Sequence, residues 1–123
     1  MREAAVVIGL DGEPIYWHVP EDRSAGSIPD SDVLWNVLWE NRDNLLGVAH
    51  SHPGGGVPGP SHTDVTTFRA VEAGLGKKLL WWITSSETVV VFHTVHEAFP
   101  HDVTYQILPE EPAWAAELRE LSR

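Results

Sequence analysis

Residues 45–64 read LLGVAHSHPGGGVPGPSHTD, and this stretch carries the clearest local signals of structure in the chain. The apolar run 45–50 has the length of a buried strand, and residues 51–60 are rich in Gly and Pro, as expected for a loop. Ser61 is placed to cap a following helix, and Asp64 stands three residues later, as in a capping box. The segment therefore predicts a strand, a turning loop and a helix N-terminus in succession.

On the N-terminal side of this segment, the sequence predicts a hairpin. Residues 4–10 are apolar, Asp11-Gly12 marks a tight turn, and residues 14–19 have the character of a return strand. The polar, turn-rich residues 20–29 are expected to form a loop.

A helix is then expected from Asp30 or Ser31, either of which can serve as its N-cap, to about Arg42. Its apolar residues recur at helical spacing and predict one buried stripe. The residues of this stripe are Val33, Leu34, Val37 and Leu38.

On the C-terminal side, the pattern predicts further alternation of helices and strands. The expected elements are a helix over 62–73 ended by Gly74 and Gly76, strands over 79–84, 88–93 and 103–108, and a final helix opened by Pro112. The tryptophans Trp35, Trp39, Trp81 and Trp82 are expected in the core or at an interface. The elements together predict an α/β (α+β) fold, in which helices flank a central mixed β-sheet, as one domain over residues 1–123.

The composition excludes several classes of function. The 123 residues include no Cys, so any metal must be bound by His and carboxylate rather than by thiolate. The formal net charge of -10 argues against nucleic acid and against anionic membrane surfaces as partners. No apolar run approaches the roughly 18 residues of a membrane span, and no signal peptide is recognised, so a cytoplasmic protein is expected.

His50 and His52 are the first candidates for metal ligands. Alternate residues of a strand point to the same side, so both imidazoles can reach one ion. The Gly- and Pro-rich loop can return Asp64 to this pair. Two His and one carboxylate leave a fourth tetrahedral position for water, which is the pattern of a catalytic zinc site. The sequence therefore predicts Zn²⁺ bound by His50, His52 and Asp64.

Simpler roles are open to the same residues. Asp64 is also a favourable acid for the first turn of a helix, and Ser61 is also an ordinary N-cap. Two imidazoles on an apolar strand are harder to explain without a ligand, because buried imidazoles need partners. A cupin-type metal site would require a Glu shortly after the histidines, where this chain has Gly56 and Val57.

The residues His50-Ser51-His52-Pro53 and Ser61-His62-Thr63-Asp64 resemble the signature of the JAMM family of zinc metalloproteases, also called MPN-plus or JAB, in a small prokaryotic-type form. The likeness in the order of elements covers most of residues 1–93. It implies a cytidine-deaminase-like JAMM/MPN architecture and a peptidase or isopeptidase acting on ubiquitin-like proteins or on the tails of sulfur carriers. The spacer between His52 and Ser61 is one residue longer than is usual in the family, which a bulge in the glycine-rich loop would absorb.

The same resemblance implies two catalytic residues. The family uses a glutamate from an early strand, and the upstream candidates are Glu3, Glu13, Glu21 and Glu40. Glu3 is favoured because it heads the first apolar run, whereas the other three fall in a turn, in a loop and near a helix end. Glu3 would be the general base and Ser61 would stabilise the oxyanion. The alternative for Glu3 is a frayed terminal residue.

Two rival functions stay open. One is a non-catalytic MPN-like scaffold that binds a protein partner, although such scaffolds typically lose metal ligands and this chain keeps all three. The other is a hydrolase that acts on a small molecule with the same metal machinery. The expected partner is a protein or peptide substrate.

Overall fold

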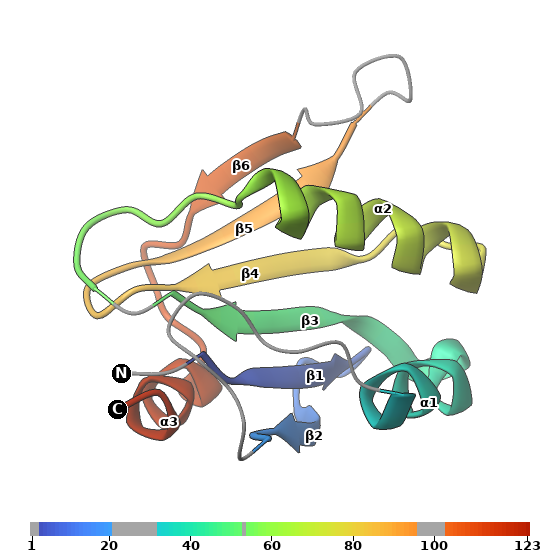
Figure 1. Cartoon of the computed structure of the whole chain (residues 1–123). Coiled ribbons are helices and arrows are strands. Elements are labelled where there is room, and N and C mark those ends of the chain that lie inside the picture. The colour runs from blue at the N-terminus through green and yellow to red at the C-terminus, as the bar shows by residue number, and fades with distance from the viewer. Residues whose placement is uncertain (1–2, 21–31, 53, 96–102) are drawn as a thin grey trace.

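The structure is a computed structural model that describes residues 3–20, 32–52, 54–95 and 103–123. Its centre is a six-stranded sheet with the strand order β2-β1-β3-β4-β5-β6 (Figure 1). Strands β3 and β4 run parallel, and the other neighbouring strands of this sheet run antiparallel. The predicted fold class, a mixed sheet flanked by helices, is confirmed.

The described elements follow the predicted order closely. They are β1 (Ala5–Gly9), β2 (Pro14–His18), α1 (Asp32–Glu40), the 3-10 turn η1 (Arg42–Asn44), β3 (Leu45–Ser51), α2 (His62–Leu75), β4 (Leu80–Thr84), β5 (Val89–Thr94), β6 (Val103–Ile107) and α3 (Ala113–Leu121). The predicted caps Asp30 and Ser31 of the first helix, and most of the predicted loop 20–29, lie outside the described residues.

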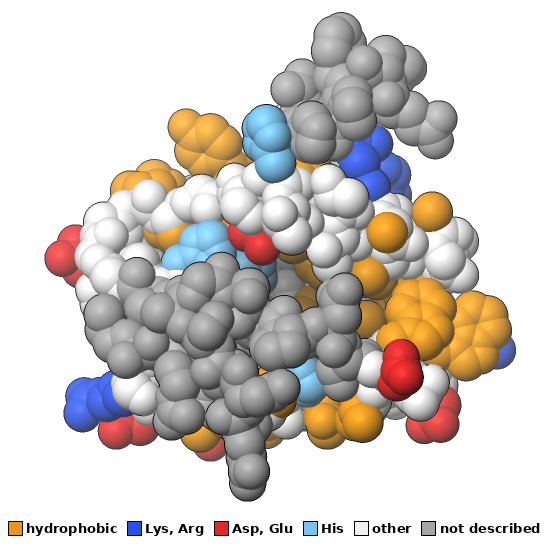
Figure 2. All heavy atoms as spheres, viewed as in Figure 1, with side chains coloured by type: hydrophobic (Ala, Val, Ile, Leu, Met, Phe, Trp, Pro, Cys, Tyr) orange, Lys and Arg blue, Asp and Glu red, His pale blue; other side chains and the backbone are white. Residues whose placement is uncertain are grey.

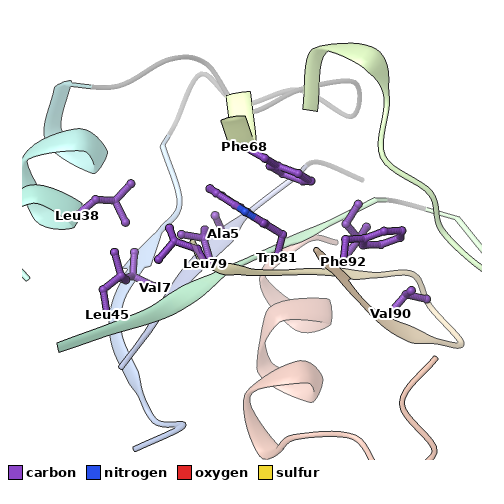
Figure 3. Packing of buried hydrophobic residues seen from close by; sticks show 11 residues of the cluster. Ala5, Val7, Leu38, Leu45, Phe68, Leu79, Trp81, Val90 and Phe92 are labelled. Atoms are coloured by element: carbon purple, nitrogen blue, oxygen red, sulfur yellow. The ribbon is translucent and has the colours of Figure 1, made fainter. Parts of the chain in front are cut away.

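The helices cover both faces of the sheet. On one face, Leu38 of α1 and Phe68 of α2 pack against the sheet, and the Phe68 ring stacks on Trp81 of β4 with the ring centroids 4.3 Å apart (Figure 3). On the other face, α3 places Trp114 and Leu118 in a second apolar cluster that includes Trp82. Trp81 and Trp82 therefore lie on opposite sides of one strand, and both are buried, as predicted.

The predicted stripe of α1 is wrong at Val33. Leu38 is buried, and Leu34 and Val37 pack against the core, but Val33 is 57% exposed. At about 100° per residue, Val33 lies a quarter turn from the centre of the stripe formed by the other three. Trp35 and Trp39 of the same helix are partly exposed and stack on each other, with ring centroids 6.3 Å apart.

Helix α2 continues past Gly74, which was predicted to end it. The helix ends at Gly76, the other glycine predicted to end it, whose φ of 71° is left-handed and whose N–H donates to the carbonyl of Glu72 at 2.8 Å. A glycine inside a helix costs only about 1 kcal/mol, which does not terminate it. The lack of a side chain at Gly74 also allows the Trp35 ring of α1 to approach α2, because an added Cβ would lie 2.8 Å from that ring.

A close approach of backbone fixes β3 against β4 at Gly47. A Cβ at this position would overlap the backbone carbonyl of Leu80. We expect Gly47→Ala to lower the free energy of unfolding by about 1–3 kcal/mol or more, as overpacking in a core does. Urea denaturation measures this loss, and Gly59→Ala is the control because its Cβ would meet no atom within 4 Å. An unchanged urea midpoint in Gly47→Ala would show that the two strands can separate locally at no cost.

Candidate metal centre

The two histidines lie where β3 leaves the sheet. His50 is on the face that α1 and α2 cover, and the backbone N–H of His52 extends the parallel pairing by donating to the carbonyl of Thr84 at 2.8 Å. The two side chains point the same way, and their Nε2 atoms are 3.1 Å apart. His50 is buried and His52 is half-buried, so the pair faces a partly enclosed space.

The first turn of α2 adds a carboxylate to this pair. Oδ2 of Asp64 lies 3.2 Å from Nε2 of His52 and 3.6 Å from Nε2 of His50. The same oxygen accepts a hydrogen bond of 2.9 Å from the backbone N–H of Ser61, and Ser61 Oγ accepts one of 3.0 Å from the N–H of Asp64. The capping box that starts the helix therefore also holds the Asp64 carboxylate against the histidines.

The spacing of these atoms fits a single small cation. Zinc bonds of about 2.0–2.2 Å in tetrahedral geometry place neighbouring ligand atoms about 3.3 Å apart. The three separations among the ligand atoms of His50, His52 and Asp64 are 3.1, 3.2 and 3.6 Å. Two imidazoles and a carboxylate are also a donor set that zinc accepts. The residues present thus fit the metal that the sequence predicts.

Glu3 lies beside this cluster and is not a frayed end. The antiparallel register pairs Ala5 of β1 with His50 of β3, so two residues further along Glu3 stands opposite His52. Glu3 is 4% exposed, and its carboxylate and the two imidazoles offer atoms that all lie within 4.8 Å of one another. Of the other upstream candidates, Glu13 and Glu40 are exposed, and Glu21 lies outside the described residues.

Ser51, for which the sequence predicts no role, positions the segment that leads from Glu3 into β1. Its Oγ accepts a hydrogen bond of 3.0 Å from the N–H of Ala4, and its own N–H donates to the carbonyl of Ala4. The hydroxyl of Ser122, after α3, donates to the same Oγ. The sequence contains one sign of this role. Ser51 is a small hydroxyl residue between two histidines, so its side chain must face the opposite side of the strand from theirs.

The longer loop after His52 is held in place by the turn between β4 and β5. Gly54 and Gly56 have φ values of 118° and 82°, which side chains rarely adopt. The N–H of Ser86 donates to the carbonyl of Gly54, and the hydroxyl of Ser85 donates to that of Gly56. The extra residue of the spacer therefore does not prevent Asp64 from reaching the histidines.

The electrostatics of the cluster follow from burial and from the short contacts. Burial opposes ionisation of Asp64, but hydrogen bonds from His50 and His52 outweigh it and hold the Asp64 pKa far below its usual range. Burial also disfavours a charged His52, yet the hydrogen bond and charge of Asp64, with the charge of Glu3, raise the His52 pKa. Burial raises the pKa of Glu3, with the histidines partly offsetting the rise. The Glu3 carboxylate is therefore more basic than an exposed one.

Among the contacts that the structure describes, Ser61 forms hydrogen bonds with Asp64 and none with the two histidines. We expect Ser61→Ala to lower the free energy of unfolding by about 1 kcal/mol, the usual cost of losing an N-cap. Zinc content is expected to be unchanged, because the backbone N–H of Ser61 still holds Oδ2 of Asp64. Thermal unfolding and metal analysis measure both quantities, and Ser61→Thr, which keeps the capping oxygen, is the control. Loss of zinc in Ser61→Ala would mean that the hydroxyl, and not the backbone, positions the carboxylate.

Figure 2 shows histidine side chains beside carboxylate atoms on the same face of the molecule. Among the helices that the structure describes, none has the length and apolar character that a membrane crossing requires.

No curated protein matches the chain significantly. The model of prokaryotic homologs of the JAB domain matches residues 3–100, a range that includes Glu3, both histidines and Asp64. The chain therefore belongs to the family of prokaryotic homologs of the JAB domain.

Proposed function

We propose that the chain is a zinc-dependent peptidase or isopeptidase that hydrolyses the tail of a ubiquitin-like or sulfur-carrier protein. The observation that carries the proposal is the convergence of His50, His52 and Asp64 at ligand spacing, with the buried Glu3 carboxylate beside them. A scaffold has no need of a buried carboxylate next to a metal centre, because burying a charge costs free energy.

In this proposal, His50, His52 and Asp64 hold the zinc ion. When bound, zinc supplies Lewis acidity, which activates water and polarises a carbonyl. Glu3 accepts the proton that the attacking water releases and gives it to the leaving amine. Its raised pKa suits both steps, because a general base works best when its pKa approaches the ambient pH.

Ser61 is proposed to stabilise the oxyanion. Its Oγ already accepts the hydrogen bond from the N–H of Asp64, and a hydroxyl that accepts one bond can still donate its own hydrogen. The hydroxyl lies in the turn that places Asp64 at the histidines, so a carbonyl that approaches this cluster also approaches Ser61.

Metal analysis followed by a cleavage screen tests the proposal. The purified chain is expected to hold about one zinc ion, as a site with three protein ligands does. The zinc-loaded protein is then offered fusions that end in the tails of ubiquitin-like and sulfur-carrier proteins, and mass spectrometry identifies the products. Cleavage that a chelator abolishes and zinc restores supports the proposal. Bound zinc with no cleavage of any tail would favour the scaffold.

A further inference from the structure

A cavity of about 470 Å³ opens between α1 and α2 above the sheet and is continuous with the candidate metal centre. Three of its lining residues, Glu3, His50 and Asp64, belong to that centre. Most of the rest are apolar and come from both helices and from the strands beneath them. These apolar residues are Ala5, Leu34, Trp35, Leu38, Val48, Phe68, Ala70, Val71 and Trp81.

The character of the cavity changes along α2. Asp64 lines it from the first turn of the helix, and Val71 lines it two turns later, about 10 Å further along at the usual rise per residue. Near Val71 the Trp35 ring reaches across from α1 and lies against Gly74, so the two helices approach each other closely there. In Figure 2, hydrophobic side chains gather over α1 on this face. The cavity therefore runs from a polar end at the metal centre to an apolar, aromatic end.

The charges of the lining restrict what can occupy this space. The acidic residues Glu3, Asp32 and Asp64 line it, and the described lining includes no Lys or Arg. An anionic side chain is therefore disfavoured in the part of the cavity beyond the metal centre. The indole N–H of Trp81 already donates to Glu72, so this ring presents only its apolar surface. The volume falls in the range of about 300–1,000 Å³ that ligand sites have, which is far more than a glycine residue requires.

We infer that this cavity binds a large, uncharged apolar side chain of the substrate, such as Leu or Phe, next to the bond that is cleaved. The inference rests on the proposed function, because the metal centre defines where that bond lies. The cavity would give the enzyme a preference among substrates that the metal ligands alone do not supply. The carbonyl of the cleaved bond would lie at the polar end, and the side chain next to it would lie between α1 and α2. The lining residues that set this preference are Trp35, Ala70 and Val71.

Fluorogenic peptides of one sequence test the preference directly. The residue on either side of the cleaved bond is varied among Gly, Leu, Phe and Asp, and kcat/KM is measured with the zinc-loaded chain. We expect Leu or Phe at one of the two positions to raise kcat/KM over Gly by about 10-fold or more, because each added methylene in an apolar pocket contributes substantially. Asp at that position is expected to be no better than Gly.

A matched pair of variants on α2 locates the effect. Ala70 is exposed on the helix but lines the cavity, whereas Ala73 is exposed on the same helix and does not line it. Ala70→Phe is expected to fill the cavity and to reduce the preference for Leu or Phe over Gly by about 10-fold or more. Ala73→Phe is expected to keep the preference. Melting temperature and zinc content show that both variants are folded and metal-loaded.

A binding measurement separates this inference from the proposed function. In NMR spectra of wild type, acetyl-Gly-Leu-amide is expected to shift the indole N–H resonances of Trp35 and Trp81, whereas acetyl-Gly-Gly-amide is expected to leave them unchanged. In Ala70→Phe, acetyl-Gly-Leu-amide is expected to cause no such shifts. If these shifts occur but no peptide is cleaved, the apolar binding site is supported and the proposed hydrolase function is refuted. Cleavage with equal kcat/KM for Gly, Leu and Phe peptides would overturn the inference and keep the hydrolase. Neither shifts nor cleavage would overturn both.

Discussion

Glu3→Gln is expected to bind zinc like the unchanged chain and to hydrolyse its substrate about 100-fold more slowly or worse. A positioned general base contributes roughly 10²–10⁴-fold to a rate, and Gln keeps the size and one oxygen of Glu but cannot accept a proton. Glu3 is 4% exposed and stands beside both imidazoles, so a water held at the metal centre lies within its reach. The fold is expected to survive, because replacing a buried carboxylate by an amide removes a desolvation cost.

The rate of Glu3→Gln is compared with that of Glu13→Gln at matched zinc content. Glu13 is exposed beside the turn between β1 and β2, away from the metal centre, so its variant is expected to match wild type. Equal rates in all three proteins would remove Glu3 from the mechanism and require another base. Loss of zinc in Glu3→Gln would instead make Glu3 a metal ligand.

His52→Ala is expected to lose bound zinc and, with it, all measurable hydrolysis. Removing one of three protein ligands leaves Asp64 and His50 facing a gap, and two ligands do not hold zinc against a chelator. The domain should stay folded, because the His52 side chain is half-buried at the end of β3 and the two apolar clusters do not include it. Metal analysis after dialysis and circular dichroism measure the two outcomes.

His93→Ala is the matched control for the loss of zinc. His93 is exposed on β5 and takes no part in the centre, so this variant is expected to keep both zinc and activity. Zinc that persists in His52→Ala would refute the assignment of the ligands. Together, Glu3→Gln and His52→Ala separate a residue that moves protons from one that holds the metal.

The elements of the fold could be predicted because their signals are local. Strand β3 shows as an apolar run before the glycine-rich loop, and helix α2 shows through Ser61 and Asp64, whose capping bonds the structure contains. The errors arose where a distant segment intervened. Gly74 reads as a helix end, but it lies inside α2, against the Trp35 ring of another helix. Val33 reads as a buried apolar residue, but the orientation of α1 on the sheet leaves it exposed.

By itself, the sequence determined that His50 and His52 face the same side, because residues two apart on a strand always do. It also indicated that Asp64 lies in the first turn of a helix that follows a Gly- and Pro-rich loop. The meeting of these three residues with Glu3 depends on the tertiary structure. The antiparallel register of β1 on β3 places Glu3 opposite His52, and the hydrogen bond from Ala4 to Ser51 stabilises that register. The cavity between α1 and α2 likewise depends on the tertiary structure, because its lining comes from segments that are distant in the chain. Such segments pack together because they bury apolar surface jointly, and no local sequence pattern encodes that packing.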